Sequence, residues 1–344
     1  MNKLNINKIN ANKISSWTPS FTTIMKILRL GGKLFNPNAK TLRIFTNLRI
    51  DKIITPKPSH IKYHKVNSKI LTNSNMGEWI WNTRNVLDRK SHTHYIFYIH
   101  GGAFCAGNTY NARGFLYQLA ERTNSVIFSS NYRKAPEFKY PIPLTDCITG
   151  YEYFISKIKN LDTNPLIIIA GDSAGGNLSI NIIAHLIKTN QLNQQNQQNQ
   201  LNQPIPSGCI LISPWVNLAD DGNGQSWVNN CAYDFVKYDL AKFFAHEYIN
   251  PGITNLQDVS PLFLKDNILS KFPPTLIEYG DLETLQDQIT QFAIKLKKSG
   301  TDVIYNSRYE MTHNYPLLYF TKIPQAEDFF ISVNEFIKKI EIYI

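Results

Sequence analysis

Short apolar runs alternate with longer segments of helical period along most of the chain. Each run holds four to eight residues and is bounded by turn-forming residues, which is typical of strands. The runs predict strands at 61–66, 78–81, 95–99, 126–129, 166–170, 209–212, 273–280 and 303–309. The periodic segments predict helices at 144–159, 177–187, 288–299 and 325–340. Strands that alternate with helices predict an α/β fold with a mainly parallel sheet.

The first two strands form an exception, because only a short connection joins them. We expect them to pair antiparallel through a turn at 72–77. A second exception is the tract at 190–203, which is rich in asparagine and glutamine and contains only two leucines. Such a tract cannot form a core, so it is predicted to be a surface insertion without a catalytic role.

Two further segments are predicted to form a helical cap over the sheet. Residues 21–35 place Phe21 and Met25 near one helical face and Lys26 toward the other, as in an amphipathic helix. Such a helix either packs on the protein, as part of a lid, or lies on a membrane surface, and we favour packing. Residues 216–264 interrupt the alternation and are aromatic and helical in pattern.

The predicted domain organisation follows from these segments. It comprises a disordered or loosely held N-terminus at 1–20, a cap formed by 21–55 and 216–264, and an α/β core formed by 56–215 and 265–344. A chain of 344 residues, of which 43% are hydrophobic, is long enough for one large core with a smaller appendage.

Charge and cysteine content limit the partners. The net charge is +10, but the lysines are spread along the chain without a dense basic block, which disfavours nucleic acid and leaves open a peripheral membrane or lipid contact. Cys105, Cys147, Cys209 and Cys231 lack metal-type spacing, and three lie in apolar segments, which is typical of reduced cysteines. With no secretory leader or membrane-spanning run, a cytoplasmic protein is predicted. No metal or cofactor is expected, and the oligomeric state is unknown.

The candidate chemistry begins at Ser173, in the sequence Gly-Asp-Ser-Ala-Gly at 171–175. This stretch follows a buried strand and opens a helix, which predicts a nucleophile elbow, a sharp turn that exposes the serine oxygen. A glycine-rich connection or a phosphate cradle would look similar. The phosphate interpretation fails because no Gly-Lys-Ser/Thr follows.

A serine nucleophile needs a base and an acid that orients the base, and in an α/β sheet both follow later strands. His313 lies just past the last strand and is the base candidate. Three carboxylates are candidates for the role of the acid, because Asp281, Glu283 and Asp287 all follow the strand that ends at 280. The order serine, acid, histidine matches the order expected for this fold.

The oxyanion that forms during acyl transfer needs backbone N–H donors. Ala174, directly after the nucleophile, offers one at a helix N-terminus. The loop after the strand 95–99 offers the others, at Gly101, Gly102 and Ala103, where glycines allow a close approach of the backbone.

Five stretches together resemble the hormone-sensitive lipase branch of the α/β-hydrolase esterases, which includes arylacetamide deacetylases. They are His-Gly-Gly-Ala-Phe at 100–104, Asn-Tyr-Arg-Lys-Ala-Pro-Glu at 131–137, Gly-Asp-Ser-Ala-Gly-Gly-Asn at 171–177, Ser-Pro-Trp at 213–215 and Gly-Asp-Leu-Glu-Thr-Leu-Gln-Asp at 280–287. The resemblance covers residues 78–335 and implies a mostly parallel eight-stranded sheet, flanked by helices, with a helical cap.

The resemblance also implies roles for individual residues. Gly102 and Ala103 would donate to the oxyanion with Ala174, although the family usually has a third glycine in place of Ala103. The acid of the family, often aspartate, falls on Glu283, so we rank Glu283 first, Asp281 second and Asp287 third.

The predicted function is hydrolysis of small to medium apolar carboxylic esters by a serine esterase, through an acyl-enzyme on Ser173. Two alternatives remain at this point. Some members of the branch have become non-catalytic small-molecule receptors by losing the histidine, whereas this chain retains it. An acyltransferase would use an alcohol in place of water.

Overall fold

An eight-stranded sheet forms the centre of the protein, in the order β1-β2-β4-β3-β5-β6-β7-β8. The computed structural model describes residues 14–34, 39–47, 57–67, 75–84, 94–195, 203–253 and 255–342. The strands are β1 (Ile61–Asn67), β2 (Asn75–Asn82), β3 (His94–Ile99), β4 (Ser125–Ser130), β5 (Leu166–Asp172), β6 (Gly208–Ile212), β7 (Thr275–Gly280) and β8 (Val303–Arg308). All eight predicted strands are therefore present, with ends that differ by a few residues.

Strands β3 to β8 run parallel, whereas β1 pairs antiparallel with β2 and β2 antiparallel with β4. The predicted antiparallel pair is thus confirmed. Its predicted turn at 72–77 is wrong in part, because β2 already begins at Asn75, and residues 72–74 lie outside the described residues. Parallel strands bring their carboxyl ends to one edge, where the loops that follow β3, β5, β6, β7 and β8 meet.

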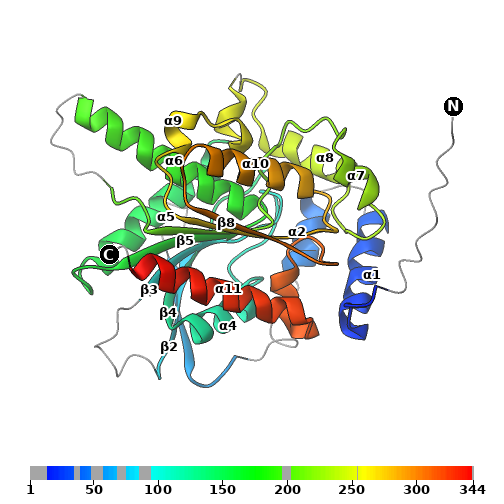
Figure 1. Ribbon diagram of the computed structural model, residues 1–344, viewed down its shortest axis with the longest axis horizontal. Helices are drawn as coiled ribbons and strands as arrows, with labels where there is room; N and C mark the ends of the chain where they lie inside the picture. The colour runs from blue at the N-terminus through cyan, green and yellow to red at the C-terminus, as the bar shows by residue number, and fades with distance from the viewer. Residues whose placement is uncertain are drawn as a thin grey trace.

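Helices cover both faces of the sheet (Figure 1). Helices α4 (Arg113–Thr123) and α11 (Pro324–Glu341) lie on one face, and α5 (Ile142–Ile158), α6 (Ala174–Gln195) and α10 (Gln286–Lys298) lie on the other. Alternate residues of each strand serve the two layers: in β3, Phe97 and Ile99 join one apolar cluster, and Ile96 and Tyr98 join the other. These layers confirm the predicted α/β class.

Two helical features differ from the prediction. Helix α4 was not predicted, because its buried side includes Arg113 and Thr123, which obscure the apolar period. Helix α6 was expected to end at 187 but continues to Gln195, into the Asn/Gln-rich tract. The tract contains no glycine and its proline comes only after Gln203, so no strong stop signal precedes residue 195. Residues 196–202 lie outside the described residues.

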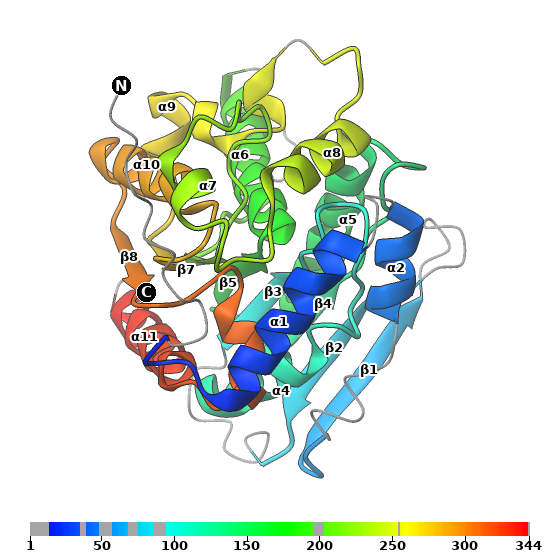
Figure 2. The ribbon, with the colours of Figure 1, turned by 90° about the vertical axis from the view of Figure 1, so that its right-hand side faces the viewer.

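Helices from two distant segments gather beyond the carboxyl edge of the sheet, and Figure 2 looks toward them. They are α1 (Pro19–Leu34), α2 (Ala39–Asn47), α7 (Gln225–Asn229) and α8 (Tyr238–Tyr248). After α8, the chain returns to the core through η1 (Leu256–Asp258), η2 (Pro261–Phe263) and α9 (Asp266–Leu269). The first and second parts of the predicted cap thus lie at the same end of the molecule.

Helix α1 packs on the protein through its apolar face. Phe21 and Met25 are fully buried, and Lys26 is exposed. Before the helix, the Trp17 indole N–H donates to the carbonyl of Glu310 at 2.6 Å. The predicted amphipathic helix is confirmed, apart from Phe35, which lies outside the described residues together with 1–13.

Cys105, Cys147 and Cys209 are buried free thiols, and Cys231 is an exposed one. This agrees with the expectation of reduced cysteines. Among the described helices, none combines the length and apolar character needed to cross a membrane.

Candidate active site

Ser173 lies at the turn between β5 and α6, with a positive φ of 52°. A non-glycine residue in this left-handed region is strained and persists only where its surroundings hold it. Here the Ser173 N–H donates to the Ile212 carbonyl at 2.9 Å, and the Ser173 carbonyl accepts from Asn177 and Trp215, both at 3.1 Å. Ser173 Oγ makes no hydrogen bond to another described residue, so it stays available as a nucleophile.

The small residues around Ser173 are required by close approaches of the backbone. A Cβ at Gly175 would lie 2.1 Å from the carbonyl oxygen of Ile99, and a Cβ at Gly171 would lie 2.5 Å from that of Gly175. Both distances are far below van der Waals contact, so the first turn of α6 approaches β3 and β5 only with glycine there. The predicted strand–turn–helix at Ser173 is therefore present, and the close approach of the backbone explains its glycines.

The loop after β3 carries the other predicted oxyanion donors. Gly102 has φ 119° and Ala103 has φ 53°, so both lie in the left-handed region. No hydrogen bond to a described residue occupies the N–H groups of Gly102, Ala103 or Ala174. The N–H of Gly101, by contrast, donates to Asp172 Oδ1 at 2.9 Å. Gly101 was included among the predicted donors, and we remove it because its N–H already has a buried partner.

His100, which begins this loop, is a supporting residue. Burial lowers its pKa to about 3, assisted by the charge of Lys134, so the ring is neutral. The ring stacks on Tyr132 with 4.5 Å between centroids, and Nδ1 lies 2.7 Å from the carbonyl oxygen of Gly101. The Tyr132 hydroxyl donates to the carbonyl of His100 at 3.0 Å. Stacking and hydrogen bonding together hold the start of the loop.

Of the three candidate acids, Glu283 faces His313. Its Oε1 lies 3.8 Å from His313 Nδ1, and both residues are buried. Neither of these two atoms has a hydrogen-bond partner. Asp287 is engaged elsewhere, because its Oδ2 accepts from the N–H of Ser226 at 2.8 Å. Asp281 makes no ion pair with His313, and its buried Oδ1 is unpartnered. The geometry thus favours the acid that we ranked first.

The surroundings of His313 change its proton affinity in two opposing ways. Burial lowers the pKa of the imidazole, whereas the carboxylates of Glu283, Asp234 and Asp172 raise it. The carboxylates prevail, and the pKa of His313 lies above its ordinary value of 6.5. A base with this pKa takes up a proton readily near neutral pH.

Asp172 connects the elbow at Ser173 to the loop after β8 that carries His313, which we call the histidine loop. Its Oδ1 accepts from the Tyr98 hydroxyl at 2.6 Å as well as from Gly101, and its Oδ2 accepts from the Asn314 side-chain amide at 2.9 Å. Asn314 and Asp172 directly adjoin His313 and Ser173 in the chain. This one carboxylate therefore links the elbow and the histidine loop to the loop that begins at His100 and carries the predicted oxyanion donors, which we call the oxyanion loop.

Ser213, at the end of β6, makes a second connection. Its hydroxyl donates to Glu283 Oε2 at 2.6 Å and accepts from the N–H of Asn314 at 3.0 Å. The Gly280 N–H also donates to Glu283 Oε2, at 3.2 Å. The Ser-Pro-Trp motif marked Ser213 in the sequence, but only the fold shows that its hydroxyl joins the acid to the histidine loop.

Three residues of the segment 216–264 contact the loop of Glu283 or the ring of His313. Phe235 belongs to the aromatic pattern that the sequence showed in this segment, whereas nothing in the sequence distinguished Asn230 or Asp234. The Asn230 amide donates to the carbonyls of Asp281 and Glu283 at 3.0 and 2.9 Å. Asp234 accepts from the N–H of Thr284 at 2.8 Å. The Phe235 ring meets His313 edge-on, with 5.7 Å between centroids. The loop 281–287, which carries the candidate acids and which we call the acid loop, is thus held by residues of the segment 216–264.

Within the described residues, no group of three or more His, Cys, Asp or Glu side chains is placed to hold a metal ion. The functional groups at this edge are instead a hydroxyl, an imidazole, a carboxylate and free N–H donors. These are the groups of nucleophilic acyl transfer.

Comparison with known proteins agrees with this chemistry. The family model for the alpha/beta hydrolase fold matches residues 96–317. An esterase of Acinetobacter venetianus is 30% identical over 260 residues, which cover 74% of this chain and 78% of that protein. The arylacetamide deacetylase of Bos taurus is 27% identical over 279 residues, with 66% and 69% covered.

The fold is also similar to solved structures. An esterase from the bacterial hormone-sensitive lipase family superposes with a TM-score of 0.75 at 22% identity, over 94% of this chain and 98% of that chain. Together, these findings confirm the resemblance seen in the motifs. The chain belongs to the α/β-hydrolase fold family, among its esterase-type members, the carboxylic ester hydrolases.

Proposed function

We propose that the protein hydrolyses uncharged, apolar carboxylic esters through a triad of Ser173, His313 and Glu283. The observation that carries the proposal is the buried Glu283 carboxylate, which faces His313 Nδ1 at 3.8 Å while Asn314 ties the histidine loop to Asp172, beside Ser173. Hydrogen bonds of a free active site are often long and shorten in the substrate complex.

The reaction begins when Ser173 Oγ attacks the ester carbonyl carbon and His313 takes the hydroxyl proton. The oxyanion of the tetrahedral intermediate accepts hydrogen bonds from the N–H groups of Gly102, Ala103 and Ala174. His313 then gives its proton to the oxygen of the leaving alcohol, and the C–O bond breaks. Glu283 stabilises the imidazolium during both transfers.

Water completes the cycle on the acyl-enzyme. His313 takes a proton from the water, whose oxygen attacks the acyl carbon, and the second tetrahedral intermediate collapses. Ser173 leaves as the alcohol after receiving its proton from His313, and the carboxylic acid is released. Every step uses groups of this chain, the ester and water.

An aromatic ring near the site supports an apolar substrate, because Phe235 lies against His313 with 5.7 Å between centroids. Phe104 and Tyr248 stack on each other but are fully buried, so they belong to the core that carries the site. We propose that 21–55 and 216–264 act as the cap that encloses such a substrate. The cytoplasmic location remains a prediction.

The test compares Ser173→Ala with Ser156→Ala, which removes an exposed hydroxyl on α5. We expect Ser173→Ala to lose about 10⁴–10⁶-fold in kcat on p-nitrophenyl butyrate, and to lose labelling by a fluorophosphonate probe, while Ser156→Ala keeps both. Unchanged thermal unfolding would show that the loss is chemical. Activity retained in Ser173→Ala would overturn the triad, and a folded wild-type protein that is neither labelled nor active would indicate a small-molecule binder.

A further inference from the structure

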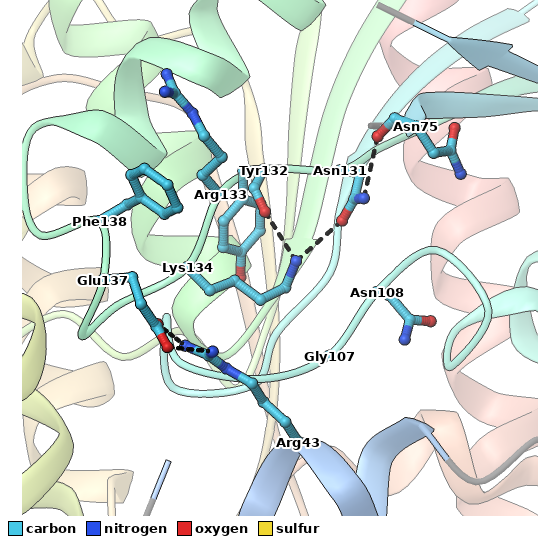
Figure 3. Close-up of a pocket in the computed structure, with 10 residues that line it drawn as sticks. All are labelled: Arg43, Asn75, Gly107, Asn108, Asn131, Tyr132, Arg133, Lys134, Glu137 and Phe138. Carbon is cyan, nitrogen blue, oxygen red and sulfur yellow. Dashed lines mark hydrogen bonds and ion pairs between the residues drawn. The ribbon is translucent and has the colours of Figure 1, made fainter. Parts of the chain in front are cut away.

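A cavity of about 300 Å³ lies beside the loop that follows β3 and is lined by none of the residues proposed for catalysis. Figure 3 shows its polar lining, which includes Arg43, Asn75, Asn108, Asn131, Lys134 and Glu137. Gly107 also lines it and closes the loop that begins at His100. The cavity and the active site thus share one loop of the backbone.

Most charges around this cavity are paired. Arg43 forms a two-pronged ion pair with Glu137, and it also donates to the carbonyls of Cys105 and Ala135. Arg133 points away from Lys134 in Figure 3 and pairs with Asp146 at 2.7 Å. These two pairs are each neutral, so they leave no net charge at the cavity.

Lys134 is the exception. Its ammonium donates to Asn131 Oδ1 at 3.1 Å and to the carbonyl of Tyr132 at 2.8 Å, and Figure 3 shows it between these two groups. No carboxylate of a described residue lies within 4.0 Å of it. The ammonium also lies 5.0 Å from the centroid of the Tyr132 ring, a cation–π contact. An ammonium has three donors, so one N–H remains without an oxygen or nitrogen acceptor among the described residues. Burial, and secondly the charge of Arg43, lower the pKa of Lys134 to about 8, as expected for a cation without a counter-ion.

The rest of the lining indicates the class of ligand. One unpaired cation matches one negative charge, whereas a dianion would need a second. The side chains of Tyr132 and Phe138 also line the cavity and offer apolar surface beside the charge. A volume of about 300 Å³ exceeds what a simple inorganic ion fills and suits a small organic molecule.

We propose that this cavity binds a small aliphatic carboxylate, with one carboxylate oxygen on the ammonium of Lys134 and the alkyl chain toward Phe138. The bound anion would supply the counter-ion and the third acceptor that Lys134 lacks. Asn131 Oδ1, which accepts from Lys134, also lies 3.3 Å from Nε2 of His100. The site is therefore in contact with the residue that begins the oxyanion loop.

The experiment titrates butyrate into the full-length protein by isothermal titration calorimetry at pH 7 and constant ionic strength, with chloride as the balancing anion. We expect one butyrate per chain. Lys134→Met should weaken binding at least tenfold, because the counter-charge is removed. Lys139→Met is the matched control, since Lys139 donates to the His246 carbonyl and does not line the cavity.

A second variant shows whether a loss of butyrate binding comes from the missing charge or from a loss of folding. Lys134→Gln keeps a donor for Asn131 and Tyr132 but lacks the charge, so it should fold and also lose butyrate. Butyrate that binds equally well to folded Lys134→Gln would overturn the proposal, because the anion would then sit elsewhere, for example at the active site. Absence of binding to the wild-type protein, or tighter binding of inorganic phosphate than of butyrate at Lys134, would overturn it as well.

Discussion

The two halves of the proposed active site are held in different ways. The nucleophile half, Ser173 with the oxyanion loop, rests on consecutive residues at the ends of β5 and β3, on main-chain hydrogen bonds and on the carboxylate of Asp172. The acid–histidine half, Glu283 with His313, lies in two loops that are held by side chains from elsewhere. Ser213 is 70 residues and Asn230 is 53 residues from Glu283 in the chain.

The difference separates local from long-range specification. A strand–turn–helix with glycines at fixed positions forms the turn that carries Ser173, and main-chain groups of Ile212 and Trp215 hold it there. Glu283 reaches His313 only when β6, β7, β8 and the segment around Asn230 have all assembled. We therefore expect substitutions that remove supporting side chains to damage the acid–histidine half most, and to do so without changing access to Ser173.

The largest effect is expected from the acid itself. Glu283→Gln keeps the size and one acceptor but removes the charge that stabilises the imidazolium, so kcat should fall by about 10³–10⁴-fold. Asp287→Asn and Asp281→Asn are matched controls and should stay within about tenfold of the wild type, since neither carboxylate pairs with His313. Steady-state kinetics on p-nitrophenyl butyrate distinguishes these variants. A larger loss in either control would assign the role of the acid to the aspartate changed in that control.

Ser213→Ala comes next. Without its hydroxyl, Glu283 Oε2 loses its shortest hydrogen bond and the Asn314 N–H loses its acceptor, so kcat should fall by about 10–100-fold while KM changes little. Ser213 has φ 44°, so Ser213→Gly removes the hydroxyl while relieving the backbone. Equal losses in both variants would identify the hydroxyl as a positioning group, and full activity in Ser213→Gly would contradict this.

Asn230→Ala tests the support from outside the core. Its amide donates to two carbonyls of the acid loop, and of these only that of Glu283 keeps another donor among the described residues, the N–H of Gln286 at 3.3 Å. Loss of these hydrogen bonds should lower the free energy of unfolding by about 1–3 kcal/mol. A loss of a few fold in kcat should accompany it. Asn229→Ala changes an exposed neighbour on α7 and should alter neither quantity in urea unfolding or kinetics. Equal effects of the two variants would show that Asn230 has no special role.

The smallest expected effect is a shift in the pH dependence of kcat/KM. His313 acts as a base only when neutral, and its pKa lies above 6.5, so kcat/KM should fall as the pH drops through a midpoint above 6.5. In Glu283→Gln a large part of the raising interaction disappears while burial remains, so the midpoint should shift downward. A pH–rate profile of both proteins measures this shift, and an unchanged midpoint would show that Glu283 does not act on His313.

The contrast between the two halves also explains which site residues could be predicted from the sequence and which could not. Ser173, Gly102 and the presence of the eight strands were predictable because each depends on a short run of neighbours. The choice of Glu283 over Asp281 and Asp287 needed a family resemblance, since all three follow the same strand. Gly101 was misjudged as a donor because only the packed fold brings Asp172 Oδ1 to its N–H. Asn230 and Asp234 carry no local signal, since their importance comes from what they contact, whereas Phe235 belongs to an aromatic pattern that the sequence shows.

Helix α4 and the length of α6 show the same limit for the fold. A buried Arg113 looks polar in a periodicity argument, but it lies between the rings of Tyr63 and Tyr110 and pairs with Glu78. The end of α6 lacks a local stop signal. The partners of Arg113 lie outside the window that a periodic pattern examines, whereas the missing stop signal of α6 is local and shows that a polar composition alone does not end a helix.

The docking of residues 15–25 against the histidine loop has a consequence for synthesis. Ser15 contacts Glu310, 295 residues further along the chain. At the usual rate of translation, residues 15–25 are made about 15–60 s before their binding site exists. Throughout that interval Trp17, Phe21 and Met25 have no native surface to cover them. Helix α1, the first of the described helices, is therefore among the last to reach its place, and the time during which its apolar face needs protection is set by the length of chain between it and Glu310.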